Sequence, residues 1–302
     1  MSEATTATIA GATSSSANGA SPFPPIPRRP LGRTGHDVTQ FALGGEGVLR
    51  THGRMAEAVA VIHRALDQGV NYCDTAPAYA GSLDYYGAAL GQRRRDVFLA
   101  SKTHDRTRDG SLRLLDESLK RLRTDHLDLW QLHDLRTPAD LHAIFGRGGA
   151  LEALIQARDE GRVRFLGITG HHDPAILLDA MGRFDFDTVL VALNGADVHR
   201  LSFARRVLVE ASRRGMGVIG MKVYAAGALV RSGAPGLTPA QAMGYVLSLA
   251  GVSTVVIGCS SPDEVDQNAR IAREFQPFDP SMMLAVEEHT APNARYFTSY
   301  KK

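Results

Sequence analysis

The spacing of apolar residues changes repeatedly along the chain from Gln40 onward. Eight short runs are almost continuously apolar, and the longer segments between them carry apolar residues three and four positions apart. The first pattern is typical of strands buried on both faces, and the second of helices with one buried side. The runs expected to be strands are 41–45, 70–75, 97–103, 127–134, 164–170, 188–194, 217–223 and 254–260, and clear helical segments are 55–69, 110–123, 149–161 and 238–251.

Local residues support several of the helix boundaries. Glycine adopts the left-handed conformation that commonly ends a helix, and glycines close four helical segments. Two later helices are expected to begin where a hydroxyl residue precedes a proline, because this pair suits the N-cap and the first helical position. The glycines are Gly69, Gly161, Gly215 and Gly251, and the expected helix starts are Thr238-Pro239 and Ser261-Pro262.

Strands alternating with helices over 302 residues predict a closed (β/α)8 barrel, the TIM-barrel fold, as a single domain over residues 29–302. An open, doubly wound sheet is the alternative. The dinucleotide-binding form of that sheet carries G-x-G-x-x-G after its first strand, and the glycine pair Gly44-Gly45 lacks this spacing. The barrel is therefore favoured.

Residues 1–28 differ in composition from the rest of the chain. They are rich in Ala, Ser, Thr, Gly and Pro, with almost no large apolar residue before Phe23. Such a segment buries too little apolar surface to order itself, and it lacks the charged and apolar regions of a signal peptide. We therefore predict a flexible tail over 1–28 and a cytoplasmic protein.

Composition excludes several classes of protein. The chain is 44% hydrophobic and 22% charged with a net charge of +2, so neither nucleic acid nor a membrane is an expected partner. Its two cysteines, Cys73 and Cys259, are too few for a disulfide framework or an iron–sulfur cluster and indicate a reducing compartment. The basic run Arg93–Arg95 is interpreted as a solvated loop rather than a phosphate site.

Polar side chains stand at the carboxyl ends of three neighbouring predicted strands, where a barrel of this kind carries its active site. Asp74, Lys102 and His133 lie at the ends of the second, third and fourth strand runs, and Tyr79 follows Asp74 in a loop of small residues. Each has an ordinary explanation when taken alone, such as a turn cap, a surface lysine or a core histidine. Four of them at adjacent strand ends predict one common site.

These four residue types suit acid–base chemistry at a carbonyl group. A free tyrosine has a pKa near 10, and an ammonium within about 4–6 Å favours the phenolate and lowers that pKa. We expect Lys102 to supply this charge, Asp74 to hold the lysine, and His133 to orient the substrate oxygen through a hydrogen bond. Tyr79 is then the general acid in the reduction of an aldehyde or ketone.

The chain also resembles the aldo-keto reductase superfamily from residue 30 to about residue 275. The resemblance runs in order through PLGRTGHDV, GVNYCDTAPAYA, DVFLASKT, ESLKRLRTDHLDLWQLHDL, GALEALIQARDEGRVRFLGITGH, GVIGMK and VVIGCSSPDEVDQNA. It implies an oxidoreductase that reduces an aldehyde or ketone, or oxidises an alcohol or sugar lactol, by hydride transfer with NADP(H) or NAD(H). The family's catalytic tetrad falls on Asp74, Tyr79, Lys102 and His133, and the resemblance implies no metal and no iron–sulfur cluster.

The resemblance further implies where the nicotinamide end of the cofactor lies. Its carboxamide is usually held by Ser-Asn after the fifth strand and by Gln in the sixth, and these positions are Thr169, Gly170 and Leu190. Only Thr169 keeps a polar side chain, so Asn194 is a further candidate. The other cofactor contacts expected here are Gly45, Met221, which would pack on the nicotinamide ring, and Lys222, toward the pyrophosphate.

The segment SSPDEVDQNA begins the last helix of the resemblance, and helix N-termini bind phosphate groups. Relatives that prefer NADPH often carry a lysine and an arginine for the 2′-phosphate where this chain has Gly258 and Glu264. A contact of Glu264 with ribose hydroxyls and a capping box with Ser261 explain this residue equally well. The family favours NADP(H), whereas the residues favour NAD(H). The other contacts expected in this segment are Ser260, Ser261, Gln267 and Asn268.

The loops around the expected barrel mouth give little indication of the substrate. Glu46 and His104 are weak candidates for substrate contacts, and the segment 136–149 is expected to be a long loop. A small carbonyl or alcohol is the expected partner, and the protein is expected to be a monomer or weak oligomer.

Three alternatives remain at this stage. A regulatory subunit that binds the cofactor with little turnover, resembling potassium-channel β subunits, is the main alternative to an enzyme. A lyase or isomerase that forms a Schiff base on Lys102 is a weaker one. A metal site at His171, His172 and Asp173 is disfavoured, because adjacent histidines and an aspartate before proline lack the usual ligand spacing.

Overall fold

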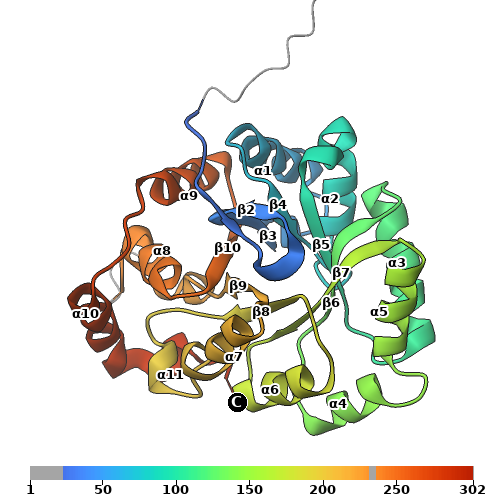
Figure 1. Ribbon diagram of the computed structural model, residues 1–302. Helices are drawn as coiled ribbons and strands as arrows, with labels where there is room; N and C mark the ends of the chain where they lie inside the picture. The colour runs from blue at the N-terminus through green and yellow to red at the C-terminus, as the bar shows by residue number, and fades with distance from the viewer. Residues whose placement is uncertain (1–22, 231–235, 302) are drawn as a thin grey trace, which may run out of the picture.

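The computed structural model describes residues 23–230 and 236–301. Its parallel strands close into a barrel in the order β10-β3-β4-β5-β6-β7-β8-β9, with helices around the outside (Figure 1). The predicted (β/α)8 barrel is confirmed. The barrel strands are β3 (Phe41–Gly47), β4 (Tyr72–Asp74), β5 (Phe98–Thr103), β6 (Leu127–Leu132), β7 (Val163–Gly170), β8 (Thr188–Ala192), β9 (Gly217–Met221) and β10 (Val252–Cys259).

The helices follow the strands in the order that the apolar periodicity predicts. Left-handed glycines lie after α1, after α5, before β9 and before β10, with φ of 86° at Gly69, 73° at Gly161, 66° at Gly215 and 90° at Gly251. The helices are α1 (Met55–Asp67), α2 (Ser82–Ala89), α3 (Arg108–Leu122), α4 (Pro138–Phe145), α5 (Ala150–Asp159), α6 (Pro174–Arg183), α7 (Val209–Arg213), α8 (Pro239–Ser248), α9 (Pro262–Glu274), α10 (Pro280–Thr290) and α11 (Ala294–Phe297).

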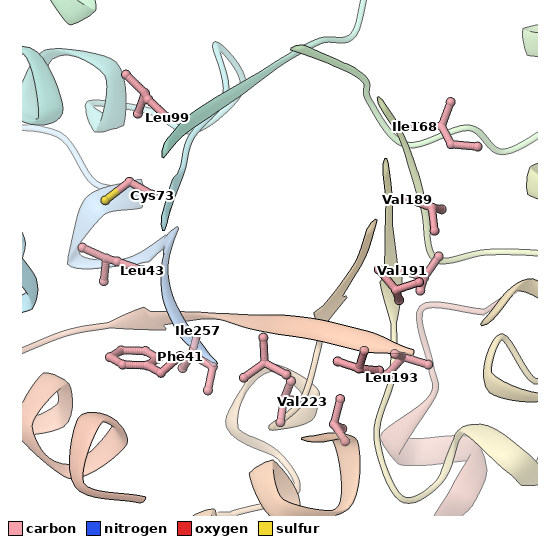
Figure 2. Close-up of a cluster of buried hydrophobic side chains, with 14 of the residues drawn as sticks. Phe41, Leu43, Cys73, Leu99, Ile168, Val189, Val191, Leu193, Val223 and Ile257 are labelled. Atoms are coloured by element: carbon pink, nitrogen blue, oxygen red, sulfur yellow. The ribbon is translucent and has the colours of Figure 1, made fainter. Parts of the chain in front are cut away.

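The main hydrophobic core lies between the strands and the helices. Side chains alternate along each strand, so every second one points out toward the helices. Figure 2 shows labelled members of this layer, such as Leu43, Leu99 and Val189, on the outer side of the strand ring. The intervening positions point into the barrel, and their polar members, at the carboxyl ends of the strands, form the site described below.

A short hairpin closes the amino-terminal end of the barrel. It consists of β1 (Arg28–Pro30) and β2 (Asp37–Thr39), which pair antiparallel. Leu31 and Val38 of this hairpin pack in one apolar cluster with the interior residues Tyr72, Phe98 and Leu129. In Figure 1 the blue hairpin lies across the ring of strands. The opposite end, at the carboxyl ends of the strands, is thus the end left for binding and chemistry.

The predicted tail over 1–28 meets the structure only in its last six residues, since 1–22 lie outside the described residues. Within this stretch, Phe23 and Ile26 pack on the barrel, whereas residues 24, 25, 27 and 28 are exposed. Ile26 is 3% exposed, and the Phe23 ring lies 4.9 Å from the guanidinium of Arg64 and 5.5 Å from that of Arg273. Two apolar residues among prolines are enough to anchor this stretch. The prediction missed them because it rested on the average composition of all 28 residues.

The basic run Arg93–Arg95 differs from its interpretation as a solvated loop. It lies in a 3-10 turn, and each arginine pairs with an aspartate. The side chain of Arg94 is only 14% exposed, pairs with Asp128 and donates hydrogen bonds to the carbonyls of Val97 and His126. It therefore braces the start of β5 against the start of β6.

Two further features bear on the class of protein. Cys73 and Cys259 are both buried free thiols. Within 23–230 and 236–301, no helix combines the length and apolarity that crossing a membrane requires.

Candidate active site

The four predicted catalytic residues meet at the carboxyl ends of β4, β5 and β6. Asp74 is the last residue of β4, Lys102 lies in β5, and His133 directly follows β6. Tyr72 and Asp74 in β4, like Ala100 and Lys102 in β5, are two positions apart and so share the inward face of their strand. In each strand, an apolar residue fills the barrel and the next inward position is polar.

A buried ion pair lies at the centre of this group. Lys102 Nζ contacts Asp74 Oδ2 and donates a second hydrogen bond to the Thr75 carbonyl at 2.9 Å. The two side chains are 0% and 4% exposed. Gln131 Nε2 donates to the other carboxylate oxygen, Asp74 Oδ1, at 3.3 Å. Because both oxygens of Asp74 are bonded, the ammonium is held in one place.

Tyr79 reaches the ion pair from the β4–α2 loop. Lys102 Nζ lies 4.6 Å from the centroid of the Tyr79 ring, and the Tyr79 phenol oxygen lies 3.5 Å from His133 Nε2. The ring is packed against Gly45, where a Cβ atom would lie 2.5 Å from Tyr79 Cδ2. Gly45, expected as a cofactor contact, therefore has a different visible role, which is to leave room for the tyrosine ring.

The electrostatic balance at Tyr79 differs from the one expected. Burial raises the pKa of Tyr79 more than the Lys102 ammonium lowers it, so the net pKa is above the ordinary value. Lys102 does lower the pKa of Tyr79 as expected, but the expectation that the overall pKa lies below the ordinary value is wrong. Burial, assisted by Lys102 and His104, holds the pKa of His133 well below its ordinary value. At neutral pH the site thus contains a protonated phenol beside a neutral imidazole.

Lys102 itself is protonated at neutral pH, because its pKa is raised. Burial alone would lower its pKa, but the interactions with Asp74 and Tyr79 outweigh that effect and raise it. An ammonium with a raised pKa stays charged throughout the physiological range. It is therefore available to stabilise a phenolate whenever one forms.

The two weak substrate candidates lie at the rim of the mouth. Glu46 pairs with Arg50 at 2.7 Å, and the Arg50 guanidinium lies 5.2 Å from the Tyr79 ring centroid. Tyr79 thus has cations on two sides, from Lys102 and Arg50. His104 is exposed just after β5. Both candidates border the catalytic group, and neither contacts the Tyr79 phenol through a recorded hydrogen bond.

The expected carboxamide-binding positions lie at the ends of β7 and β8. Thr169 Oγ1 accepts a hydrogen bond from the Asp134 backbone N–H at 2.8 Å, which ties the end of β7 to the residue after His133. A Cβ atom on Gly170 would point at Leu177 of α6, 3.1 Å away, and so away from the barrel interior. Leu190 belongs to the apolar cluster inside the barrel. Neither 170 nor 190 can therefore offer a polar side chain.

The side-chain amide of Asn194 already makes three hydrogen bonds within the protein. Its Nδ2 donates to the Lys222 carbonyl at 3.1 Å and to the Tyr300 phenol oxygen at 2.9 Å, and its Oδ1 accepts from the Ala196 N–H. Met221 ends β9 and packs against the interior apolar cluster. The neighbouring Lys222 adopts a left-handed backbone conformation, with φ of 57°.

At the beginning of α9, Glu264 makes a capping contact, and its contact with ribose hydroxyls stays an expectation. Ser261 is the N-cap and its Oγ accepts the Glu264 N–H at 3.3 Å. Glu264 Oε2 accepts the Ser260 N–H at 2.7 Å, one residue earlier than a standard capping box would place it. The Glu264 carboxylate therefore accepts the Ser260 N–H, in the segment where the resemblance implies that the cofactor phosphate binds.

Two other positions of this segment also have structural roles. A Cβ atom on Gly258 would lie 2.5 Å from Glu46 Cβ, so a lysine does not fit there without moving β3 from β10. Asn268, expected near adenine, accepts a hydrogen bond from the Tyr224 hydroxyl at 2.7 Å and donates to Cys259 Sγ at 3.5 Å. Gln267, by contrast, is exposed and free of this network.

A histidine pair lies beside the catalytic group. Asp134 Oδ1 is 3.4 Å from His171 Nε2 and 3.3 Å from His172 Nε2, a grouping compact enough for a metal ion. Asp134 also pairs with Arg136 through its other oxygen. The pKa of His171 is lowered to about 4, mainly by burial; Asp134 opposes this shift, and the nearby His172, Lys222 and Arg136 add to it. The positive charges of Lys222 and Arg136 disfavour the binding of a metal cation by Asp134, His171 and His172. Asp173 lies apart from the pair and caps α6.

Comparison with known proteins identifies the family. The family model "Aldo/keto reductase family" matches residues 41–243, from the first barrel strand into α8. The chain belongs to the aldo/keto reductase family. The resemblance noted in the sequence is thus confirmed over most of the barrel.

Relatives with assigned activities cover most of this aldo/keto reductase. It is 28% identical over 289 residues to L-galactose dehydrogenase of Arabidopsis thaliana, covering 83% of this chain and 89% of the relative. It is 26% identical over 314 residues to pyridoxal 4-dehydrogenase of Microbacterium luteolum, covering 80% and 91%. It is 27% identical over 280 residues to D-threo-aldose 1-dehydrogenase of a Pseudomonas species, covering 72% and 83%.

Solved structures agree on the fold. The holo form of an aldo-keto reductase from Bacillus halodurans superposes with a TM-score of 0.73 at 23% identity, covering 87% of this chain and 96% of that one. An aldo-keto reductase from Klebsiella pneumoniae in complex with NADPH gives 0.70 at 21% identity, covering 84% and 92%.

The structure of this aldo/keto reductase adds three contacts that the sequence argument did not predict. Gln131 holds Asp74, and strand alternation would have found it, because it lies two positions before His133. Arg106 donates to the carbonyls of His133 and Asp134 at 2.8 and 3.0 Å, although nothing in the sequence indicates this. Tyr300 reaches Asn194 from the carboxyl-terminal segment, which no local pattern predicts.

Proposed function

We propose that this aldo/keto reductase is an NAD(P)(H)-dependent oxidoreductase that interconverts an aldehyde or ketone and its alcohol or lactol. The observation that carries this proposal is the position of the Tyr79 phenol, 3.5 Å from His133 Nε2 with the Lys102 ammonium against its ring. A phenol between a neutral imidazole and an ammonium suits proton transfer to a carbonyl oxygen. This reaction class corresponds to enzymes that act on CH–OH groups with a nicotinamide cofactor.

In the reducing direction, the Tyr79 hydroxyl gives its proton to the substrate oxygen as the carbonyl carbon is reduced. The raised pKa of Tyr79 keeps the proton in place until that step. The Lys102 ammonium then stabilises the resulting phenolate, and Asp74 holds the ammonium in position. His133, as a neutral imidazole, donates a hydrogen bond that orients the same oxygen. The chemistry supplied by the bound cofactor is the hydride.

The mouth of the barrel has groups that suit the nicotinamide cofactor. The Thr169 and Tyr300 hydroxyls and the Met221 thioether lie at the ends of β7 to β9, where the family places the nicotinamide, and Lys222 is beside them. At α9, the Glu264 carboxylate on the Ser260 N–H disfavours a 2′-phosphate by charge repulsion. This local contact favours NAD(H), whereas the family as a whole favours NADP(H).

The substrate class follows from the relatives with assigned activities. L-galactose, pyridoxal and D-threo-aldose, the compounds in their names, are aldehydes that carry hydroxyl groups. We infer a hydroxylated aldehyde or its cyclic lactol as substrate. The polar rim formed by Glu46, Arg50 and His104 suits such a molecule better than an apolar one.

Fluorescence titration with NADH and NADPH tests the cofactor, and turnover of L-galactose or pyridoxal with each cofactor tests the reaction. We expect both cofactors to bind, and Glu264→Arg to strengthen NADPH binding selectively. Tyr79→Phe is expected to bind cofactor normally and lose turnover, with Tyr296→Phe, an exposed tyrosine, as the matched control. Failure of both cofactors to bind at tens of micromolar would refute the proposal.

Turnover also separates the proposal from its alternative. No structural observation favours a regulatory subunit with little activity over an enzyme. A wild-type rate far below about 1 per second, with a copurifying partner at fixed stoichiometry, would point to that alternative. The cytoplasmic location and the monomeric or weakly oligomeric state stay predictions.

A further inference from the structure

The carboxamide of the nicotinamide needs hydrogen-bond partners that the expected positions do not provide. Position 170 is a glycine whose Cβ direction faces α6, and position 190 is a leucine inside the apolar cluster. Asn194 has given both N–H groups, one to the Lys222 carbonyl and one to Tyr300. A site built only from β7 and β8 therefore offers the Thr169 hydroxyl and little else.

Tyr300 offers the donor that these positions lack. Its phenol oxygen accepts the Asn194 Nδ2 hydrogen bond at 2.9 Å, and no other described residue accepts the proton of its own hydroxyl. Burial raises the pKa of Tyr300 well above its ordinary value, so this proton is retained at any working pH. The ring lies edge-on against His171, with centroids 5.7 Å apart.

The position of Tyr300 is fixed by the residue that follows it. The Lys301 ammonium is fully buried, pairs with Asp197, and donates to the carbonyls of Asp197 and Arg200 at 3.3 and 2.8 Å. Arg200 Nη1 donates in return to the Lys301 carbonyl at 2.7 Å. These bonds lock the end of the chain onto the loop that follows β8, which carries Asn194.

Two contacts and one backbone link join Tyr300 to the catalytic group. Tyr300 packs on His171, His171 Nε2 lies 3.4 Å from Asp134 Oδ1, and Asp134 follows His133 in the chain. His133 in turn lies beside Tyr79. Tyr300 therefore belongs to the same mouth as the acid–base residues, on the side where β7 and β8 end.

We propose that the Tyr300 hydroxyl donates a hydrogen bond to the carbonyl oxygen of the nicotinamide carboxamide, in place of the side chains missing at 170 and 190. This inference rests on the proposed function, because it requires a nicotinamide cofactor. It assigns a cofactor-binding role to a residue of the carboxyl-terminal segment, and it gives the Lys301–Asp197 pair the role of positioning that residue.

The test compares Tyr300→Phe with wild type in equilibrium binding of NADH, NADPH and ADP-ribose, the last of which lacks the nicotinamide. We expect Tyr300→Phe to weaken both dinucleotides about tenfold, the effect of one lost hydrogen bond, and to leave ADP-ribose binding unchanged. The melting temperature should fall by only a few degrees, since phenylalanine keeps the ring against His171 but leaves one N–H group of Asn194 without its acceptor. Tyr296→Phe, in α11, is the matched control and should bind all three ligands as wild type does.

Four outcomes would overturn the inference. Unchanged dinucleotide binding in Tyr300→Phe, or equal weakening of ADP-ribose binding, would refute only the role of Tyr300 at the carboxamide. The proposed function would still stand. Failure of the wild type to bind any of the three ligands would remove the dinucleotide site and both proposals with it. An analogue with an acetyl group in place of the carboxamide keeps the carbonyl oxygen, so the tenfold loss should persist with it; its disappearance would assign Tyr300 to the amide nitrogen instead.

Discussion

Two buried lysine–aspartate pairs of almost identical burial lie within the part of the chain that the structure describes, and they differ in whether the ammonium has an N–H group without a hydrogen-bond acceptor. In the Lys102–Asp74 pair, the side chains are 0% and 4% exposed, and in the Lys301–Asp197 pair they are 0% and 1% exposed. Lys301 donates to a carboxylate and two carbonyls, which accounts for all three of its N–H groups. Lys102 donates to one carboxylate and one carbonyl, and its remaining side faces the Tyr79 ring.

The two aspartates also differ in the number of hydrogen bonds that they accept. Asp74 accepts hydrogen bonds from Lys102 and Gln131. The Asp197 carboxylate also accepts the Ser202 hydroxyl and the Phe203 and Ala204 N–H groups, so that pair is satisfied on both sides. Burial dominates at Lys301 and lowers its pKa, whereas the partners of Lys102 win and raise its pKa. A fully satisfied pair locks two segments together, and a pair with an unused donor can act on a neighbour. Burial alone does not separate the two roles.

The largest expected effect is the loss of activity in Lys102→Met. Removing the ammonium leaves the Tyr79 phenolate unstabilised, and we expect kcat to fall by about 10³-fold. Steady-state kinetics in the reducing direction measures this. Binding of NADH should stay within a factor of two of wild type, since Lys102 faces Tyr79 and Asp74. A small fall in kcat would mean that the unused donor of Lys102 has no chemical role.

The second effect concerns stability rather than activity. Lys301→Met leaves the Asp197 carboxylate buried without its partner, and we expect a loss of about 3–5 kcal/mol in the free energy of unfolding. Urea denaturation measures this value. The double variant Lys301→Met/Asp197→Asn removes both charges but keeps an acceptor oxygen for the Phe203 and Ala204 N–H groups, and it should recover part of the loss. A single variant as stable as wild type would show that the pair does not lock the carboxyl-terminal segment.

The pH dependence of the reaction should report the raised pKa of Tyr79. Oxidation of the alcohol or lactol needs the phenolate, and below a raised pKa its fraction grows about tenfold per pH unit. We therefore expect the oxidation rate to increase about 10²-fold from about pH 7 to about pH 9, while the reduction rate stays nearly flat because the phenol is already protonated. Initial rates in both directions across this range provide the check. An oxidation rate that levels off near pH 7 would contradict the raised pKa.

A smaller effect is expected where Gln131 supports Asp74. Gln131→Leu removes the amide that donates to Asp74 Oδ1, and a lost hydrogen bond to a charged group amounts to about 1.5–3 kcal/mol. We expect kcat to fall about tenfold, with the KM for the carbonyl substrate little changed. The matched control is Gln92→Leu in an exposed turn. Equal kcat values for the two variants would show that the Lys102–Asp74 pair needs no third residue.

The smallest expected effect is that of metal removal. Arg136 and Lys222 surround the Asp134, His171 and His172 group with positive charge, so a bound divalent cation is disfavoured there. Dialysis against a chelator should change turnover by less than about twofold, and metal analysis of the purified protein should find no stoichiometric ion. Restoration of lost activity by added zinc would reverse this expectation.

The difference between the two pairs also explains what the sequence could predict. Asp74, Lys102 and His133 lie on strands whose period of two determines which side chains face inward, so their meeting was predictable from the alternation alone. The fold was predictable from another pattern, the alternation of continuously apolar runs with segments of helical spacing. Gln131 follows the same rule and was missed only because its inward position was not considered.

Other features depend on contacts between segments far apart in the chain, which periodicity cannot show. Tyr300 meets Asn194 across 106 positions, and Arg106 meets His133 through backbone carbonyls that carry no sequence information. The helix α4, within a segment expected to be a loop, was a different kind of error. Thr137 and Asp140 form a capping box around Pro138, a local start pattern that was present in the sequence.

The closed strand order has a consequence for how the chain folds. The seam between β3 and β10 brings together residues such as Gln40 and Thr254, which are 214 positions apart. Contacts of such long range form slowly, because a large loop must close before they contribute stability. On a ribosome, β3 has to wait until β10 has been made before its second neighbour exists. Lys301 arrives later still, so the two sides of the mouth are completed at different times: the acid–base side once His133 has been made, and the other side only after Tyr300 and Lys301 have followed.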